Sequence, residues 1–230
     1  MNNFNAKQLE LVIFDMDGLM FDTEKVSYQS FTEAIKYHGY DLDEATFRKT
    51  LGCNLQKAKK IYQERFGEDF PFEGVIEKKF AYSDHYIQEK GVPIKEGLYE
   101  LLDFLCEHKI KKAVATSSNR EVALNLLKMA GIDHKFEYVL CGDEIENSKP
   151  DPGIFLRVAE KLNCHAERCI VLEDSEMGIL AAHRAGMRAI MIPDMVKANK
   201  ETKKLLFKEM KSLLEVKQYL TEQQYYSKAL

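Results

Sequence analysis

Two carboxylates separated by one residue follow a short apolar run near the start of the chain. Residues 11–14, Leu-Val-Ile-Phe, show no polar alternation, which is typical of a strand buried on both faces. Asp15 and Asp17 come next, and side chains two apart in an extended chain point to the same side. Gly18 then permits a sharp turn. The spacing predicts two converging acids at the carboxyl end of a buried strand, with a polar, Asp-rich turn as the plainer alternative.

Polar groups also follow two later apolar runs. Thr116-Ser117-Ser118-Asn119 is a series of small donors ahead of a predicted helix, and helix N-termini favour anions. Glu173-Asp174 ends another apolar run, and Lys149 stands just before Pro150 and a further helix. Each group has an ordinary interpretation as well: helix capping for the Thr/Ser run and for Glu173-Asp174, and a surface position for Lys149.

The elements that must position these groups alternate between strand and helix. Such alternation predicts βαβ units and a parallel sheet with helices on both faces, a doubly wound α/β fold. Crossovers are right-handed, so the carboxyl ends of all strands meet at one edge, where open α/β sheets bind ligands. The predicted strands are residues 11–14, 113–116, 138–141, 169–172 and 189–192.

A long helical stretch interrupts this pattern after the first strand. Residues 55–66 and 72–87 read as helices, and no strong strand candidate lies between Asp22 and Val92. We therefore expect an all-helical insertion with its ends at these two positions. The predicted division is a catalytic core of residues 1–21 and 93–221, a helical domain of residues 22–92, and a frayed polar tail of residues 222–230.

Electrostatics indicates that the strand-end acids need a cation. Two like charges about 4 Å apart repel by ~4 kcal/mol at a typical effective dielectric, and Lys149 is the single cation expected among four acids. The available ligands are all oxygens, which suits Mg²⁺ and does not suit zinc. Mg²⁺ commonly bridges protein carboxylates to a phosphate, for which the Thr/Ser run and Lys149 supply donors.

The composition limits the function classes. The chain has 230 residues with a net charge of −4 and no dense basic run, which argues against nucleic acid as a partner. No apolar run is long enough to cross a bilayer. The five cysteines are scattered and read as reduced thiols, so we expect a cytoplasmic protein without membrane partners. We expect a monomer or a weak homodimer.

The motifs, in this order and spacing, resemble the haloacid dehalogenase superfamily of phosphohydrolases, in the branch with a helical cap inserted after the first strand. That resemblance implies that Asp15 is a nucleophile that forms an aspartyl-phosphate and that Asp17 is the general acid/base. It also implies Mg²⁺ bound by Asp15, Asp174 and the backbone carbonyl of Asp17, with Glu173 supporting the metal directly or through water. The motifs that carry it are Asp15-Met16-Asp17-Gly18, Thr116, Lys149 before Pro150, and Glu173-Asp174.

The same resemblance implies roles in substrate binding. Thr116, Ser117 and Lys149 would hold the phosphate. Asn54, in the polar break Gly52-Cys53-Asn54, would belong to a cap loop that faces the catalytic edge and selects the substrate. A plain helix–helix turn is the alternative for that segment.

We therefore predict a Mg²⁺-dependent phosphatase of a small phosphorylated metabolite, with a sugar phosphate as the expected substrate. A phosphomutase resembling β-phosphoglucomutase is the alternative from another enzyme class, and a non-enzymatic phosphate-binding protein is the third. In β-phosphoglucomutases an arginine of the cap loop holds the second phosphate, and the matching position here is Leu55. A cap histidine of theirs corresponds to Ser27. Dehalogenation is disfavoured because it has no evident use for the Glu173-Asp174 pair.

Overall fold

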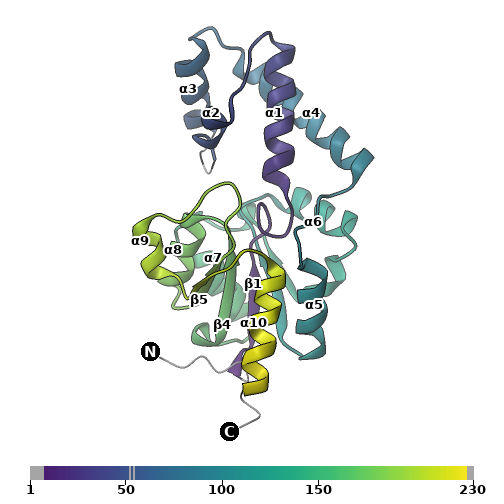
Figure 1. The fold of residues 1–230 in the computed structure, drawn as a ribbon, viewed down its shortest axis with the longest axis vertical. Coiled ribbons are helices and arrows are strands. Elements are labelled where there is room, and N and C mark those ends of the chain that lie inside the picture. The colour runs from purple at the N-terminus through teal and green to yellow at the C-terminus, as the bar shows by residue number, and fades with distance from the viewer. Residues whose placement is uncertain (1–7, 52, 54, 227–230) are drawn as a thin grey trace. The chain divides into compact units, whose positions relative to one another are not determined.

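The computed structural model describes residues 8–51, 53 and 55–226. The chain divides into two compact units (Figure 1). The larger unit consists of Met1–Phe21 and Ile94–Leu230, and the smaller unit is Asp22–Pro93. That the smaller unit acts as a cap in catalysis stays a prediction.

A parallel sheet of six strands forms the centre of the larger unit, in the order β3-β2-β1-β4-β5-β6. The central strand β1 pairs with β2 on one side and β4 on the other, with Phe14 aligned to Val114 and to Leu172. This register brings the residues that follow these three strands to one edge. The predicted parallel α/β fold is thus confirmed. The strands are β1 Leu11–Phe14, β2 Lys111–Ala115, β3 Tyr138–Leu140, β4 Cys169–Glu173, β5 Arg188–Met191 and β6 Lys208–Glu209.

Helices cover both faces of this sheet. One face packs Ile154, Phe155 and Ile179 from two helices against Ile13 and Val171 of the strands. On the other side of the fold α5 and α10 pack against each other, as Figure 1 shows. The helices of the larger unit are α5 Leu98–Glu107, α6 Arg120–Met129, α7 Gly153–Lys161, α8 Glu176–Arg184, α9 Lys200–Leu205 and α10 Leu213–Tyr226, with short 3₁₀ turns at Asp133–Lys135, Gly142–Glu144 and Ala166–Arg168.

The smaller unit is helical and is held together by aromatic side chains. Tyr62 is fully buried, and its ring lies within 6.0 Å of the rings of Phe31, Phe70 and Phe72 (centroid to centroid). Large ring contacts of this kind stabilise a small helical core beyond the burial of their area. The helices are α1 Thr23–Tyr37, α2 Glu44–Arg48, α3 Leu55–Phe66 and α4 Phe72–Lys90.

The chain leaves and re-enters the larger unit along adjacent paths. Phe21 and Ile94 form an isolated antiparallel bridge. Beside it, the Asp22 amide donates to the Pro93 carbonyl at 2.8 Å, and the Lys95 amide donates to the Met20 carbonyl at 3.0 Å. The two connecting segments are therefore paired as a short ribbon.

The C-terminal part contains two elements that the sequence patterns do not indicate. α10 continues to Tyr226, and its residues Val216 and Leu220 are buried, while a frayed tail stays a prediction. Residues 227–230 lie outside the described part of the chain. The sheet also gains the two-residue strand β6, which is too short and too polar to leave a hydrophobic signature in the sequence.

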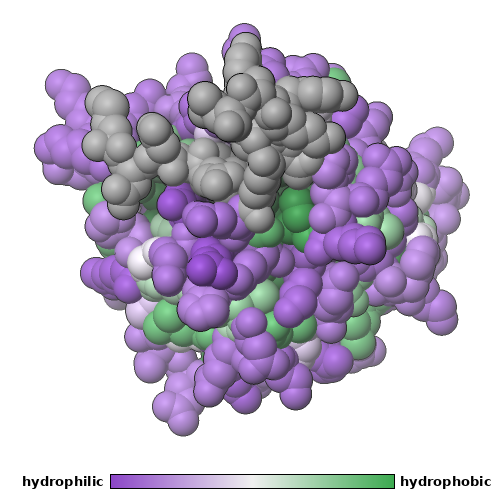
Figure 2. Space-filling model, turned by 90° about the horizontal axis from the view of Figure 1, so that it is seen from below, coloured by the Kyte–Doolittle hydropathy of each residue, from purple (hydrophilic) through white to green (hydrophobic). Residues whose placement is uncertain are grey.

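Hydrophilic and apolar residues are unevenly distributed on the surface. Hydrophilic residues dominate the face seen in Figure 2, which includes the end of the larger unit where the strands begin, with apolar residues scattered among them. Across residues 8–51, 53 and 55–226, no helix is long and apolar enough to cross a bilayer.

Gly97 provides a test of how the larger unit is packed. It precedes α5 with φ +85°, and a Cβ there would overlap the backbone of Leu214 in α10. We expect Gly97→Ala to lower the free energy of unfolding by about 3 kcal/mol, from the left-handed conformation and the overlap together. Gly131→Ala is the matched control, since it has φ +68° with nothing within 4 Å, and should cost about 1 kcal/mol. If urea denaturation shows that both variants lose the same free energy of unfolding, the close contact between Gly97 and Leu214 is contradicted.

Candidate active site

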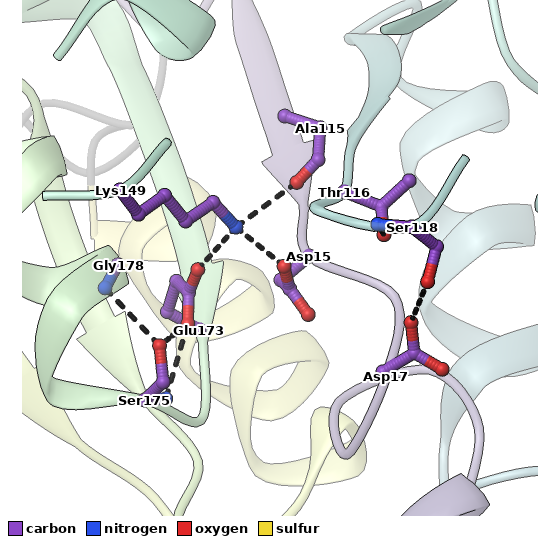
Figure 3. Close-up of polar contacts among 9 residues, drawn as sticks. All are labelled: Asp15, Asp17, Ala115, Thr116, Ser118, Lys149, Glu173, Ser175 and Gly178. Atoms are coloured by element: carbon purple, nitrogen blue, oxygen red, sulfur yellow. Dashed lines mark hydrogen bonds and ion pairs between the residues drawn. The ribbon is translucent and has the colours of Figure 1, made fainter. Parts of the chain in front are cut away.

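Lys149 lies at the centre of a buried charge cluster at the carboxyl edge of the sheet (Figure 3). Its ammonium group forms ion pairs with Asp15 and, at 2.6 Å, with Glu173 Oε1, and it donates to the Ala115 carbonyl at 3.1 Å. Asp15 follows β1, Ala115 ends β2 and Glu173 ends β4, so three neighbouring strands supply the contacts. Asp15 is 7% exposed and Glu173 is 0% exposed.

Glu173 is fixed from a second direction by the first turn of α8. Its Oε2 accepts from the Ser175 amide at 3.0 Å and from the Ser175 hydroxyl at 2.8 Å. Ser175 is also the N-cap of α8, since its Oγ accepts from the Gly178 amide at 3.1 Å. Both oxygens of Glu173 therefore have protein donors, which orients the carboxylate toward Lys149.

Burial and charge set the ionisation of this cluster. Burial raises the pKa of Asp15 to about 7, with the Glu173 charge adding to the rise and the Lys149 charge opposing it. Burial alone would lower the pKa of Lys149, but the charges of Asp15 and Glu173 outweigh it and hold that pKa above its ordinary value. One ammonium thus balances only one of two buried carboxylates. A divalent cation beside Asp15 would favour its ionised form at neutral pH.

The neighbouring Asp174 completes a group of acids able to hold such a cation. Single carboxylate oxygens of Asp15, Glu173 and Asp174 all lie within 4.8 Å of one another. Gly18 allows this approach, because it has φ +81° and a Cβ there would overlap the Asp174 carboxylate. The donors are oxygens throughout, which fits Mg²⁺.

Asp17 lies beside this cluster and is bound by Ser118. The Ser118 hydroxyl donates to Asp17 Oδ2 at 2.7 Å, and the Ser118 amide donates to Thr116 Oγ1 at 3.0 Å (Figure 3). Thr116 is 1% exposed, whereas Ser117 is exposed and Asp17 is half-buried. The loop after β2 thus presents its polar groups toward the acids that follow β1.

The structure brings most of the predicted site residues together. Asp15, Lys149, Glu173 and Asp174 form one cluster, and Asp17 and Thr116 are linked through Ser118. Asn54 lies outside the described residues. Sequence reasoning did not select Ser118, Ser175 or Gly178. The sequence does contain a signal for two of them. Ser175 stands at the N-cap position before a predicted helix, and Ser118 belongs to the Thr/Ser run that follows a predicted strand.

A second acidic group, Cys141, Asp143 and Glu144, is equally close-packed but has a structural explanation. Arg120 donates to Asp143 through its amide and to Glu144 through its side chain, each at 3.0 Å. Glu144 also accepts from the Cys141 amide at 3.0 Å, and burial raises the pKa of the Cys141 thiol to about 11. These contacts anchor the start of α6, and the thiol is unsuited to metal binding at neutral pH.

Gly178 tests whether Glu173 must be held in place. A Cβ at Gly178 would overlap the Glu173 carboxyl group. Alanine normally stabilises a helix relative to glycine by about 0.5–1 kcal/mol, but here it must displace Glu173 from Lys149. We expect Gly178→Ala to reduce catalytic activity by at least about tenfold while the chain remains folded. Gly74→Ala is the control, at a helical glycine of α4 where a Cβ would meet the end of the His38 ring and no active-site residue, and it should leave activity unchanged. Full activity of Gly178→Ala would contradict this account.

Comparison with known proteins agrees with this geometry. Residues 12–192 match the family model of haloacid dehalogenase-like hydrolases. A phosphorylated carbohydrates phosphatase of Thermotoga maritima is 33% identical over 187 residues, which is 79% of this chain and 84% of that protein. Fructose-1-phosphate phosphatase YqaB of Escherichia coli is 29% identical over 189 residues, 78% of this chain and 94% of the relative.

Solved structures show the same fold. One from Thermotoga maritima, provisionally named a beta-phosphoglucomutase, has a TM-score of 0.79 and 28% identity, covering 93% of this chain and 99% of the other. The resemblance inferred from the motifs is confirmed. Since the family match spans most of the chain and the named relatives are phosphatases, this chain belongs to the haloacid dehalogenase-like hydrolase family and is a phosphoric monoester hydrolase.

Proposed function

We propose that the chain is a Mg²⁺-dependent phosphatase that hydrolyses a small sugar phosphate through an aspartyl-phosphate on Asp15. The observation that carries this proposal is the buried contact of Lys149 with Asp15 and Glu173, beside Asp174. A carboxylate can attack a phosphate dianion only where its charge is neutralised, and Lys149 together with a divalent cation held by these acids would provide that neutralisation. The names of the Thermotoga maritima and Escherichia coli relatives support a sugar phosphate as the substrate.

In the first half of the reaction, an oxygen of Asp15 attacks the phosphorus atom. The bond from phosphorus to the ester oxygen breaks, and that oxygen takes a proton from the Asp17 carboxyl group. Lys149 reduces the repulsion between Asp15 and the phosphate, while Thr116 and Ser117 bind phosphate oxygens. The products of this half are an alcohol and phosphorylated Asp15, with Asp17 left as a carboxylate.

In the second half, water attacks the same phosphorus atom. Asp17 accepts a proton from the water, and the bond between phosphorus and the Asp15 oxygen breaks. Inorganic phosphate leaves, and both aspartates return to their starting protonation states. One residue therefore serves as acid and then as base.

The acids around Asp15 would hold the metal. Asp15, Asp174 and the backbone carbonyl of Asp17 would bind Mg²⁺ directly. Glu173 would act from behind them, because both of its oxygens already accept from Lys149 and Ser175. When bound, Mg²⁺ supplies positive charge to the transferring phosphoryl group.

The residue at position 55 favours hydrolysis over phosphomutase activity. A mutase must hold a bisphosphate at both ends, so its smaller domain needs a cation for the second phosphate. Leu55 stands where β-phosphoglucomutases have their arginine. Without a cation at that position, the aspartyl-phosphate should transfer to water.

A panel of phosphorylated metabolites tests the proposed function. We expect phosphate release from hexose and pentose phosphates in the presence of Mg²⁺, loss of activity on chelation with EDTA, and recovery when Mg²⁺ is added back. Ca²⁺ should not restore activity, because it prefers a higher coordination number and longer bonds. Full turnover after exhaustive chelation would contradict the metal assignment.

The same panel separates the phosphatase from the phosphomutase. The chain is given β-glucose 1-phosphate with a trace of the 1,6-bisphosphate, and both products are followed. We expect free phosphate to form faster than glucose 6-phosphate. The reverse order would replace the hydrolase proposal by the mutase.

Asp15→Asn tests the nucleophile. The change is nearly isosteric but removes the attacking charge, so we expect phosphate release to fall by at least about a thousandfold. Asp84→Asn, at an exposed position of α4, is the control and should retain full activity. Thermal unfolding followed by circular dichroism shows whether both variants are folded. A folded Asp15→Asn chain with substantial turnover would rule out Asp15 as the nucleophile.

A further inference from the structure

Ser118 has no role in the chemistry so far, yet its hydroxyl contacts the residue that moves protons. The hydrogen bond from Ser118 Oγ to Asp17 Oδ2 is 2.7 Å long and joins residues 101 positions apart in the sequence. Figure 3 shows the hydroxyl directed at one oxygen of Asp17. The contact therefore links the loop after β2 to the catalytic turn after β1.

The backbone of Ser118 is held on both sides. Its amide donates to Thr116 Oγ1 at 3.0 Å, and its carbonyl accepts from the Gly142 amide at 2.9 Å. Gly142 approaches so closely that a Cβ there would overlap the carbonyl oxygen of Ser117. A side chain attached to a backbone fixed in this way has few positions for its hydroxyl, so the bond to Asp17 has a defined direction.

Asp17 needs such a constraint more than Asp15 does. Asp15 is buried and ion-paired with Lys149, whereas Asp17 is only half-buried. Its backbone lies in a tight turn, where the Gly18 amide donates to the Phe21 carbonyl at 2.9 Å. That turn fixes the Cα of Asp17, and the Ser118 hydroxyl restricts rotation about its side-chain bonds.

We propose that Ser118 is a positioning residue that orients Asp17 for both proton transfers, an inference that rests on the proposed function. The hydroxyl can donate to Oδ2 whether or not the other oxygen of Asp17 carries a proton, so the contact is compatible with both protonation states of Asp17. Without this hydrogen bond, the Asp17 carboxyl group would still be present but would be poorly oriented for proton transfer. Misplacement of a reacting group by about 1 Å can lower a rate by about a hundredfold, so a smaller shift can lower it by about tenfold.

Comparing substrates with different leaving groups distinguishes a positioning role of Ser118 from a purely structural one. An alkyl alcohol needs a proton as it departs, whereas p-nitrophenolate leaves without one. For Ser118→Ala we expect kcat/KM to fall about tenfold on the fastest alkyl phosphate of the panel. On p-nitrophenyl phosphate kcat/KM should change less than about twofold, since it reports only the transfer to Asp15.

The second proton transfer, from water to Asp17, gives a further test with p-nitrophenyl phosphate as the substrate. Attack by water requires Asp17 as the base for every substrate, so hydrolysis of phosphorylated Asp15 should slow about tenfold. Rapid-quench measurement of the phosphorylated chain reports this step directly, and kcat and KM fall together once it limits turnover. Ser118→Thr keeps a hydroxyl and should retain most of the activity. Circular dichroism melting of each variant shows that the chain is folded.

Equal losses of kcat/KM on both esters in a folded Ser118→Ala chain would overturn the proposal, because a phosphate-binding or structural role affects both alike. Unchanged kinetics on both esters would overturn it as well. The proposed function fails separately, if the wild-type chain releases no phosphate or if Asp17→Asn behaves as wild type on the alkyl phosphate.

Discussion

The buried ammonium group of Lys149 is the interaction on which the site depends. Placing a lysine and two carboxylates inside a protein is costly unless every charge is paired and hydrogen-bonded. Here the ammonium contacts Asp15, Glu173 and the Ala115 carbonyl, so it satisfies its three donors at the ends of three strands. The sheet order β2-β1-β4 is what makes that possible. The order of the strands therefore determines which groups can contact Lys149, and with them the chemistry of the site.

Much of this could be predicted because the signals are local. Uninterrupted apolar runs identified five of the six strands, and the right-handedness of crossovers placed Asp15, Thr116 and Glu173 at one edge. The position of Lys149 followed from charge balance and the resemblance to a family. The helical end of α10 was missed, since a polar segment at the end of a chain gives no sign that the preceding turns are anchored.

The supporting residues were harder to predict, for a different reason. Ser118, Ser175 and Gly178 act through contacts with residues distant in sequence or through space that a side chain must not fill. A serine in a polar loop and a glycine in a helix have many ordinary explanations. Their roles can be assigned only once the structure shows that they contact the carboxylates of Asp17 and Glu173.

The pairing of the two connecting segments has a consequence for how the chain folds. β1 and its neighbour β2 are separated in the sequence by the whole of Asp22–Pro93 and by α5, a long loop whose closure costs entropy. Phe21 and Ile94 meet in a bridge, so a smaller unit that forms early would bring its own ends together and shorten the effective distance between the strands. The insertion then adds residues to the chain with little added contact order. In this arrangement, a long insertion between two paired strands should slow the folding of the sheet only a little.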